Sequence, residues 1–172
     1  MITELVRQVR RNHGLEHATV AVLMERGVRP PMGGYSFPGG FFVLSKASTE
    51  IVSEAAHEAL ERLRAEEPEL AVSPFCGTNL ATGALLAAAL SALVLGRKEG
   101  RLRRIPTAAG AILGAMLVSR PLGNALQRHY TTLADVSGLE ITGVKNLLGS
   151  LTGRFTVHKV RTRSSEPDLL IP

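Results

Sequence analysis

The 172-residue chain has no tryptophan, few other aromatic residues and a single cysteine. Aromatic residues make up 4% of the sequence and hydrophobic residues 45%, mostly alanine, leucine and valine, a balance that favours helices over a β-sandwich. Because Cys76 is the only cysteine, no intrachain disulfide can form, and nothing in the sequence indicates an oxidising compartment. Residues 1–7 lack the continuous apolar stretch of a signal peptide, so we expect the N-terminal region to stay in the cytoplasm.

The net charge is +5, and much of it comes from a basic run at residues 97–104. Aromatic residues do not interleave with this run, and the chain contains no helix-turn-helix or zinc-finger pattern. We therefore predict that the protein does not bind nucleic acid, and that membrane lipid is the partner of its basic and apolar segments.

Two amphipathic helices are predicted in the N-terminal half. The first covers residues 2–26, with Thr3 as its cap and Gly27 after its end, and the second covers residues 49–66, with Ser48 or Thr49 as its cap. Short strands are predicted at residues 41–44, 70–72, 139–144 and 154–160, and a disordered tail from Arg163.

Between these segments lie two uncharged, alanine-rich runs, Leu80–Leu95 and Ile105–Ser119. Each is near the lower limit for crossing a bilayer, which takes about 17–20 residues. Gly110 and Gly114 have the spacing that lets membrane helices pack closely, although a buried hairpin of a soluble protein would use small residues equally well. We favour a membrane hairpin, because two uncharged runs joined by a charged loop match the hydropathy pattern of a spanning pair.

The predicted fold is therefore α+β, with an N-terminal amphipathic helix that bears the site, short strands and an alanine-rich helical hairpin in the membrane. Its parts would be residues 1–77, 78–122 and 123–172. The orientation has two conflicting indications. The positive-inside rule puts the basic loop in the cytoplasm and sends both flanking parts across the membrane, whereas the missing signal peptide keeps the N-terminal part inside.

The first helix carries His13, Glu16 and His17 inside its apolar arc, between Val9 and Val20. The predicted arc also includes Ile2, Leu5, Val6, Leu23 and Met24, with Arg7, Gln8 and Arg11 on the opposite side. Three ionisable groups facing a core are costly unless they are paired or bind a cation. Histidines at positions i and i+4 lie one above the other on a helix, so both imidazoles can reach one metal ion, most readily zinc.

The spacing H-x-x-E-H of residues 13–17 resembles the motif of the inverzincin metallopeptidases. This resemblance covers five residues and implies that His13 and His17 are zinc ligands and Glu16 the general base. It also implies a further glutamate ligand from a later helix, for which Glu54 or Glu58 are the candidates, although both lie away from the centre of that helix's apolar side.

A second resemblance covers more of the chain. The segment H-G-L-E-H-A-T at residues 13–19, followed by C-G-T-N at residues 76–79 and an apolar hairpin, is similar to an uncharacterised bacterial family with a domain of unknown function. The resemblance implies that the two segments belong to one site. Cys76 is then the best third zinc ligand, because two histidines and one thiolate leave a fourth position open for water.

The sequence thus predicts a small zinc-dependent hydrolase of the bacterial cell membrane, with a peptide as its substrate, metal ligands His13, His17 and Cys76, and Glu16 as the catalytic base. One alternative is a non-enzymatic membrane protein with a structural metal site that Glu16 or His129 completes. Another is a cysteine peptidase in which Cys76 attacks, His13 or His17 is the base and Asn79 orients it. His57 and His158 are expected to have no functional role.

Overall fold

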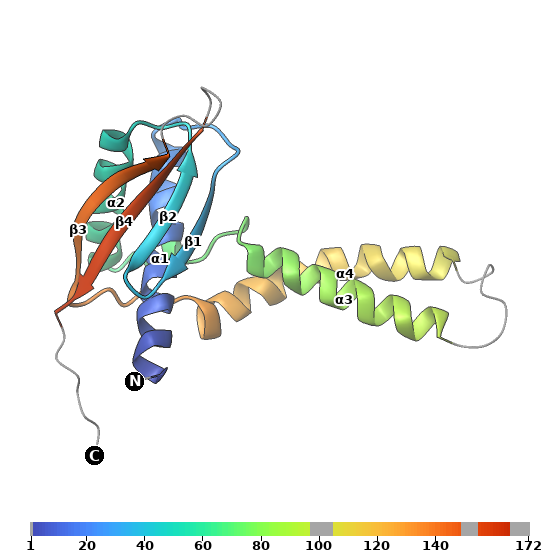
Figure 1. Ribbon diagram of the computed structural model, residues 1–172. Helices are drawn as coiled ribbons and strands as arrows, with labels where there is room; N and C mark the ends of the chain where they lie inside the picture. The colour runs from blue at the N-terminus through green and yellow to red at the C-terminus, as the bar shows by residue number, and fades with distance from the viewer. Residues whose placement is uncertain (1, 97–104, 149–154, 166–172) are drawn as a thin grey trace, which may run out of the picture. The chain divides into compact units, whose positions relative to one another are not determined.

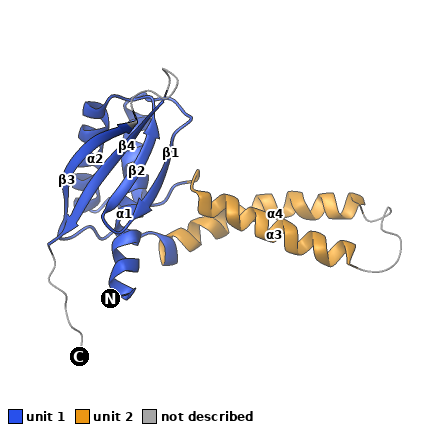
Figure 2. Ribbon diagram, viewed as in Figure 1, with its two compact units in different colours: residues 1–73, 130–172 blue, residues 74–129 orange. Residues whose placement is uncertain are grey.

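The computed structural model describes residues 2–96, 105–148 and 155–165, which fall into the two compact units coloured in Figure 2. The first unit combines residues 1–73 with residues 130–172, and the second comprises residues 74–129. The two ends of the chain therefore contribute to the same unit.

The first unit is a two-layer α+β structure, which confirms the predicted fold class. Within the described residues its antiparallel sheet has the order β1 (Gly33–Phe37), β2 (Gly40–Ser45), β4 (Thr156–Ser164) and β3 (Leu139–Leu148). Helices α1 (Ile2–Glu25) and α2 (Thr49–Arg64) cover one face of this sheet (Figure 1). The core lies between the layers and includes Leu15, Ala18, Val22, Leu23, Phe41, Val43, Val52, Ala55, Ala59, Leu63 and Val160.

Local sequence accounts for much of this layout. The Ser48 hydroxyl accepts a hydrogen bond from the Ile51 amide at 3.4 Å, which caps α2 as predicted. Residues 38 and 39 form the tight turn between β1 and β2, and Gly40 follows it with a φ of +140°. A Cβ atom at Gly40 would lie 2.0 Å from the Val160 carbonyl oxygen, so only glycine allows β2 to approach β4 this closely.

The side of α1 that faces the core differs from the predicted arc. Ile2 is 77% exposed and Val6 52% exposed, whereas Leu15, Ala18 and Val22 are fully buried. Arg11, predicted on the solvent side, is 1% exposed and donates to the Asp135 carboxylate at 3.2 Å. The reason is long-range: residues 131–135 return against this side of the helix and cover it.

Two other local predictions need correction, and one strand was not predicted. Residues 33–37 form the edge strand β1, which is not among the predicted strands, and the strand expected at residues 70–72 is replaced by the 3₁₀-helix η1 (Pro68–Ala71). Arg163 and Ser164 belong to β4 and not to a disordered tail, while residues 166–172 lie outside the described part. Two of the five residues of β1 are glycines, which have low β-propensity, so the sequence pattern did not predict this strand.

The second unit is the predicted helical hairpin, made of α3 (Gly77–Leu95) and α4 (Ile105–Leu126), which the π-helical turn η3 (Gln127–Thr131) follows. Both helices are long and apolar enough to cross a membrane, and only 6% and 17% of the residues in their most apolar stretches are buried. The buried positions are small or polar, such as Thr82, Ala115 and Ser119. The basic run at residues 97–104 lies outside the described residues.

Close packing inside the hairpin does not use the predicted glycine pair. A Cβ atom at Gly110 or Gly114 would meet no atom within 4 Å, so both glycines face away from α3. The close approaches are instead at Gly83, next to Ser119, and at Gly123, where a Cβ atom would lie 2.0 Å from the Asn79 side-chain oxygen.

Candidate metal centre

Helix α1 carries His13, Glu16 and His17 through the interior of the first unit. His17 is 5% and Glu16 6% exposed, and the side chain of His13 is 21% exposed. The two imidazole rings are neighbours, with their centroids 4.4 Å apart. The inward placement of these groups that the sequence predicted is therefore confirmed, and their burial requires an explanation in terms of bonding or of a bound cation.

The orientation of both rings is set by backbone carbonyl groups. His13 Nδ1 lies 2.9 Å from the Thr131 carbonyl oxygen, and His17 Nδ1 lies 2.9 Å from the Ala71 carbonyl oxygen. A carbonyl oxygen only accepts hydrogen bonds, so each Nδ1 must carry a proton and donate it. In the neutral ring the lone pair is then on Nε2, the atom that binds a metal when a carbonyl fixes the other ring nitrogen.

Gly14 lets the returning chain reach His13. A Cβ atom at Gly14 would lie 2.5 Å from the Leu133 carbonyl oxygen, closer than real contacts allow. Residues 131–135 also form two further hydrogen bonds with α1. The Leu133 amide donates to the Arg10 carbonyl at 2.9 Å, and Asp135 accepts from Arg11. Hydrogen bonds from Ser137 and the Arg11 guanidinium lower the pKa of Asp135, so this carboxyl group stays charged at neutral pH.

The carboxylate of Glu16 lies between the histidines and strand β1. Its Oε2 atom accepts a hydrogen bond from the Ser36 hydroxyl at 3.2 Å and lies 4.0 Å from His13 Nε2. A Cβ atom at Gly34 would lie 2.2 Å from Glu16 Oε1, so the carboxylate rests against the bare backbone of β1. Glu16 is thus held beside the histidines at a distance that suits a base acting through a water molecule.

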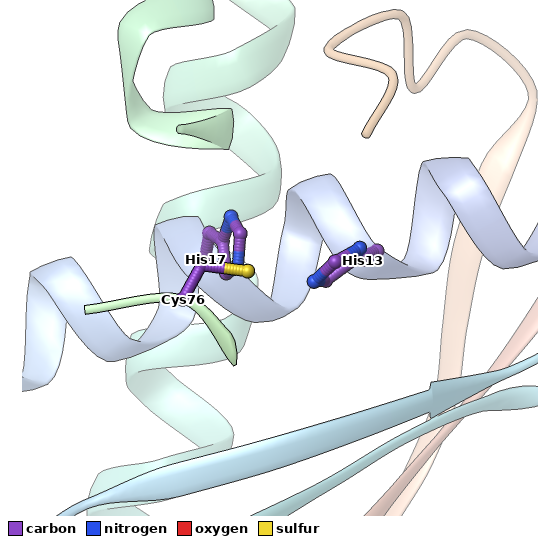
Figure 3. Close-up of side chains that lie close together, drawn as sticks. All are labelled: His13, His17 and Cys76. Atoms are coloured by element: carbon purple, nitrogen blue, oxygen red, sulfur yellow. The ribbon is translucent and has the colours of Figure 1, made fainter. Parts of the chain in front are cut away.

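Cys76 is three residues beyond Ser73, the last residue of the first unit before the hairpin. A ligand atom from each of His13, His17 and Cys76 lies within 4.8 Å of the other two. Figure 3 draws these three side chains. Tetrahedral zinc with two nitrogen ligands and one sulfur ligand needs separations of about 3.3–3.6 Å between these atoms. Two imidazole nitrogens and one thiolate are a donor set that zinc accepts.

Cys76 is also the N-terminal cap of α3. Its sulfur accepts a hydrogen bond from the Thr78 amide at 3.4 Å. Amide groups at a helix N-terminus stabilise negative charge and so favour the thiolate, the form in which cysteine binds metal.

The other candidate residues have different partners. Glu54 and Glu58 bind the Arg26 guanidinium, with closest distances of 2.7 Å and 2.6 Å, on the exposed side of α2. His57 is exposed and bonds the Ser53 carbonyl oxygen, and His129 is exposed in η3. These contacts give Glu54 and Glu58 a structural role on the surface.

Asn79 takes part in a polar network within the hairpin. It donates to the Pro74 carbonyl at 3.1 Å and to Asn124 at 3.1 Å, and accepts from the buried Gln127 at 3.0 Å. In a cysteine peptidase an amide side chain would orient the catalytic histidine. Here the backbone carbonyls of Thr131 and Ala71 take that position at Nδ1 of the two histidines.

Sequence reasoning missed Ser36 and Gly34, the two residues of β1 that contact Glu16. Their segment is rich in glycine and proline and reads as a loop. The only signal was the short alternation of small and aromatic residues from Gly34 to Phe37, which is too brief to predict a strand by itself.

The model of a family described as Domain of unknown function (DUF6391) matches residues 8–144, so the chain belongs to this family. The match includes both the histidine pair and Cys76. The chain is also 34% identical over 137 residues to an uncharacterized protein of Picosynechococcus sp. (strain ATCC 27264 / PCC 7002 / PR-6). That alignment covers 72% of this chain and 65% of the relative, so the chain spans less than two thirds of the relative's length. No solved structure is significantly similar.

Proposed function

We propose that the protein is a zinc-dependent hydrolase, most simply a peptidase, of the bacterial cell membrane. The observation that carries this proposal is the pair of 2.9 Å contacts that fix His13 and His17 with Nδ1 donating to a carbonyl. In metal sites, a histidine ligand commonly donates its other ring N–H to a carbonyl or carboxylate in this way.

His13, His17 and Cys76 would hold the zinc, and their number leaves one coordination position open. Zinc held there would lower the pKa of water to about 7 and polarise a substrate carbonyl. Glu16 would accept the proton of the attacking water at its carboxylate as the water oxygen bonds to the carbonyl carbon. It would then deliver this proton to the amide nitrogen as the C–N bond breaks and the amine leaves. Ser36 holds the carboxylate in place by donating to Oε2.

The apolar hairpin supports the membrane location. Helices α3 and α4 have the length and composition of membrane spans, and most of their apolar surface is not covered by described residues. Lipid would cover this surface at the lowest cost in free energy.

The test uses the full chain purified in detergent, its zinc content, and cleavage of a quenched fluorescent octapeptide library. We expect Glu16→Gln to keep zinc and to lower kcat by about 10²–10⁴-fold, the usual contribution of a general base. The matched control is Glu61→Gln on the exposed side of α2, which should behave like the wild type. Unchanged cleavage by Glu16→Gln, or a wild-type protein that binds no zinc, would contradict the proposal.

The burial of Glu16 and His17 favours a second candidate, a structural metal site that Glu16 completes as fourth ligand. In that case the wild type binds zinc, cleaves no peptide and loses much of its thermal stability when a chelator removes the metal. Glu16→Gln would then weaken zinc binding itself, which separates the two candidates.

A further inference from the structure

Strand β1 lies at one edge of the sheet and directly beside the candidate centre. The strand order is β1-β2-β4-β3, so among the described residues no strand pairs with the outer side of β1. Gly34 and Tyr35 of this strand are exposed, Tyr35 to 70%. The edge is therefore accessible. Exposed edge strands usually carry charged side chains or proline, which prevent pairing with another strand, and β1 has neither.

The register shows which main-chain groups this edge presents. Phe37 and Gly40 are partners on either side of the two-residue turn, and such flanking residues form a hydrogen-bonded pair. Hydrogen-bonded and non-hydrogen-bonded pairs alternate along an antiparallel ladder, so Tyr35 bonds Phe42 in the same way. Gly34 and Ser36 consequently direct their N–H and C=O groups away from β2, toward the outer side.

These same two residues contact the proposed base. The Ser36 hydroxyl donates to Glu16 Oε2. Gly34 has no side chain, and the Glu16 carboxylate occupies the space where a Cβ atom would lie. The outward N–H and C=O groups of Gly34 and Ser36 are therefore next to the Glu16 carboxylate.

We propose that an extended peptide substrate docks on the outer edge of β1 as an additional strand, paired with the main chain of Gly34 and Ser36. This inference rests on the proposed hydrolase function and specifies the surface that binds its substrate. The peptide brings its own alternating C=O and N–H groups, which repeat every two residues at about 6.8 Å, as they do along β1. Its main chain then runs past Glu16, with the scissile bond toward the histidines.

A test follows from the two-residue repeat. The best-cleaved octapeptide of the library is synthesised in two N-methylated forms, with methyl groups on alternate residues in one register or in the other. The register whose N–H groups pair with β1 should lose kcat/KM by about tenfold or more, because each methyl group removes a hydrogen bond and obstructs pairing. The register whose N–H groups point away should be cleaved at close to the parent rate.

A second readout does not require turnover. Zinc-loaded Glu16→Gln protein is mixed with the parent octapeptide, and hydrogen exchange of backbone amides is measured. We expect exchange in residues 33–37 to slow, whereas β3, which forms the opposite edge of the sheet, should not change and is the internal control.

The outcomes separate this inference from the proposed function. Zinc- and Glu16-dependent cleavage with equal rates for both methylated registers and unchanged exchange in β1 would overturn the docking proposal and leave the hydrolase intact. Protection of β3 instead of β1 would also overturn it. A zinc-loaded wild type that cleaves no octapeptide would overturn the hydrolase proposal, and the docking proposal with it.

Discussion

Replacing Gly34 by alanine should disable the proposed base without disturbing the fold. The new Cβ atom would lie 2.2 Å from Glu16 Oε1, so the carboxylate must retreat by about 1.2 Å to reach the 3.4 Å limit of ordinary contact. Displacement of a catalytic group by about 1 Å costs on the order of 100-fold in rate, which corresponds to about 2.7 kcal/mol in the activation free energy. The same Cβ atom would lie 2.4 Å from Glu16 Cδ and 2.7 Å from Glu16 Cγ, so the side chain must shift from Cγ outward. The loss of the Ser36 hydrogen bond should by itself cost about 1 kcal/mol of stability.

The assay compares kcat, zinc content and Tm of Gly34→Ala with those of Gly33→Ala. A Cβ atom at Gly33 would meet no atom within 4 Å, so this variant adds the same methyl group to the same strand without touching Glu16. We expect Gly34→Ala to keep its zinc, to lose about 100-fold in kcat and to shift Tm by no more than about 4 °C. Equal kcat values for the two variants would refute the assignment of Glu16 as a base held against β1.

Three further predictions address other parts of the structure. Gly14→Ala should lower zinc affinity by about 10–100-fold in metal titrations, because the new methyl group displaces the Leu133 carbonyl and the neighbouring Thr131 carbonyl that bonds His13. Unchanged affinity would show that the Thr131 carbonyl does not help to hold His13 for zinc. Burial lowers the pKa of His158, and neither ring nitrogen has a hydrogen-bond partner among the described residues. The unfolded chain therefore binds the proton first, so the free energy of unfolding in urea should fall as pH drops below about 6.5, and His158→Leu should remove this part of the pH dependence. Expressed in bacteria, the full chain should remain with the membrane pellet after alkaline carbonate extraction, and its release into the supernatant would exclude a spanning hairpin.

The elements that local patterns specify were predictable, and those that need distant partners were not. Helix α2 has apolar residues every three or four positions and a serine cap, and its start at Thr49 matches the prediction. The burial of Arg11 was not predictable, because it depends on chain far away in sequence, whereas β1 pairs with the neighbouring β2 and was missed because its glycines give a weak strand signal. Arg11 in particular is buried by a partner 124 residues further along the chain, which no helical wheel can show.

The candidate centre divides in the same way. Two histidines and a glutamate within five residues of one helix are close together by helix geometry alone, so the sequence was enough to place His13, Glu16 and His17. The groups that orient the rings are backbone carbonyls 54 and 118 residues away, and backbone atoms leave no sequence signature. For the same reason Gly14 gave no indication that it admits the chain that bonds His13.

X-ray absorption at the zinc edge of the purified full chain tests the central claim most directly. The account predicts a first shell with two imidazole nitrogens at about 2.0–2.1 Å and one sulfur at about 2.3 Å, and loss of zinc in the His13→Ala, His17→Ala double variant but not in His57→Ala. A wild-type protein that holds no zinc, or a zinc shell without imidazole nitrogen, would contradict it.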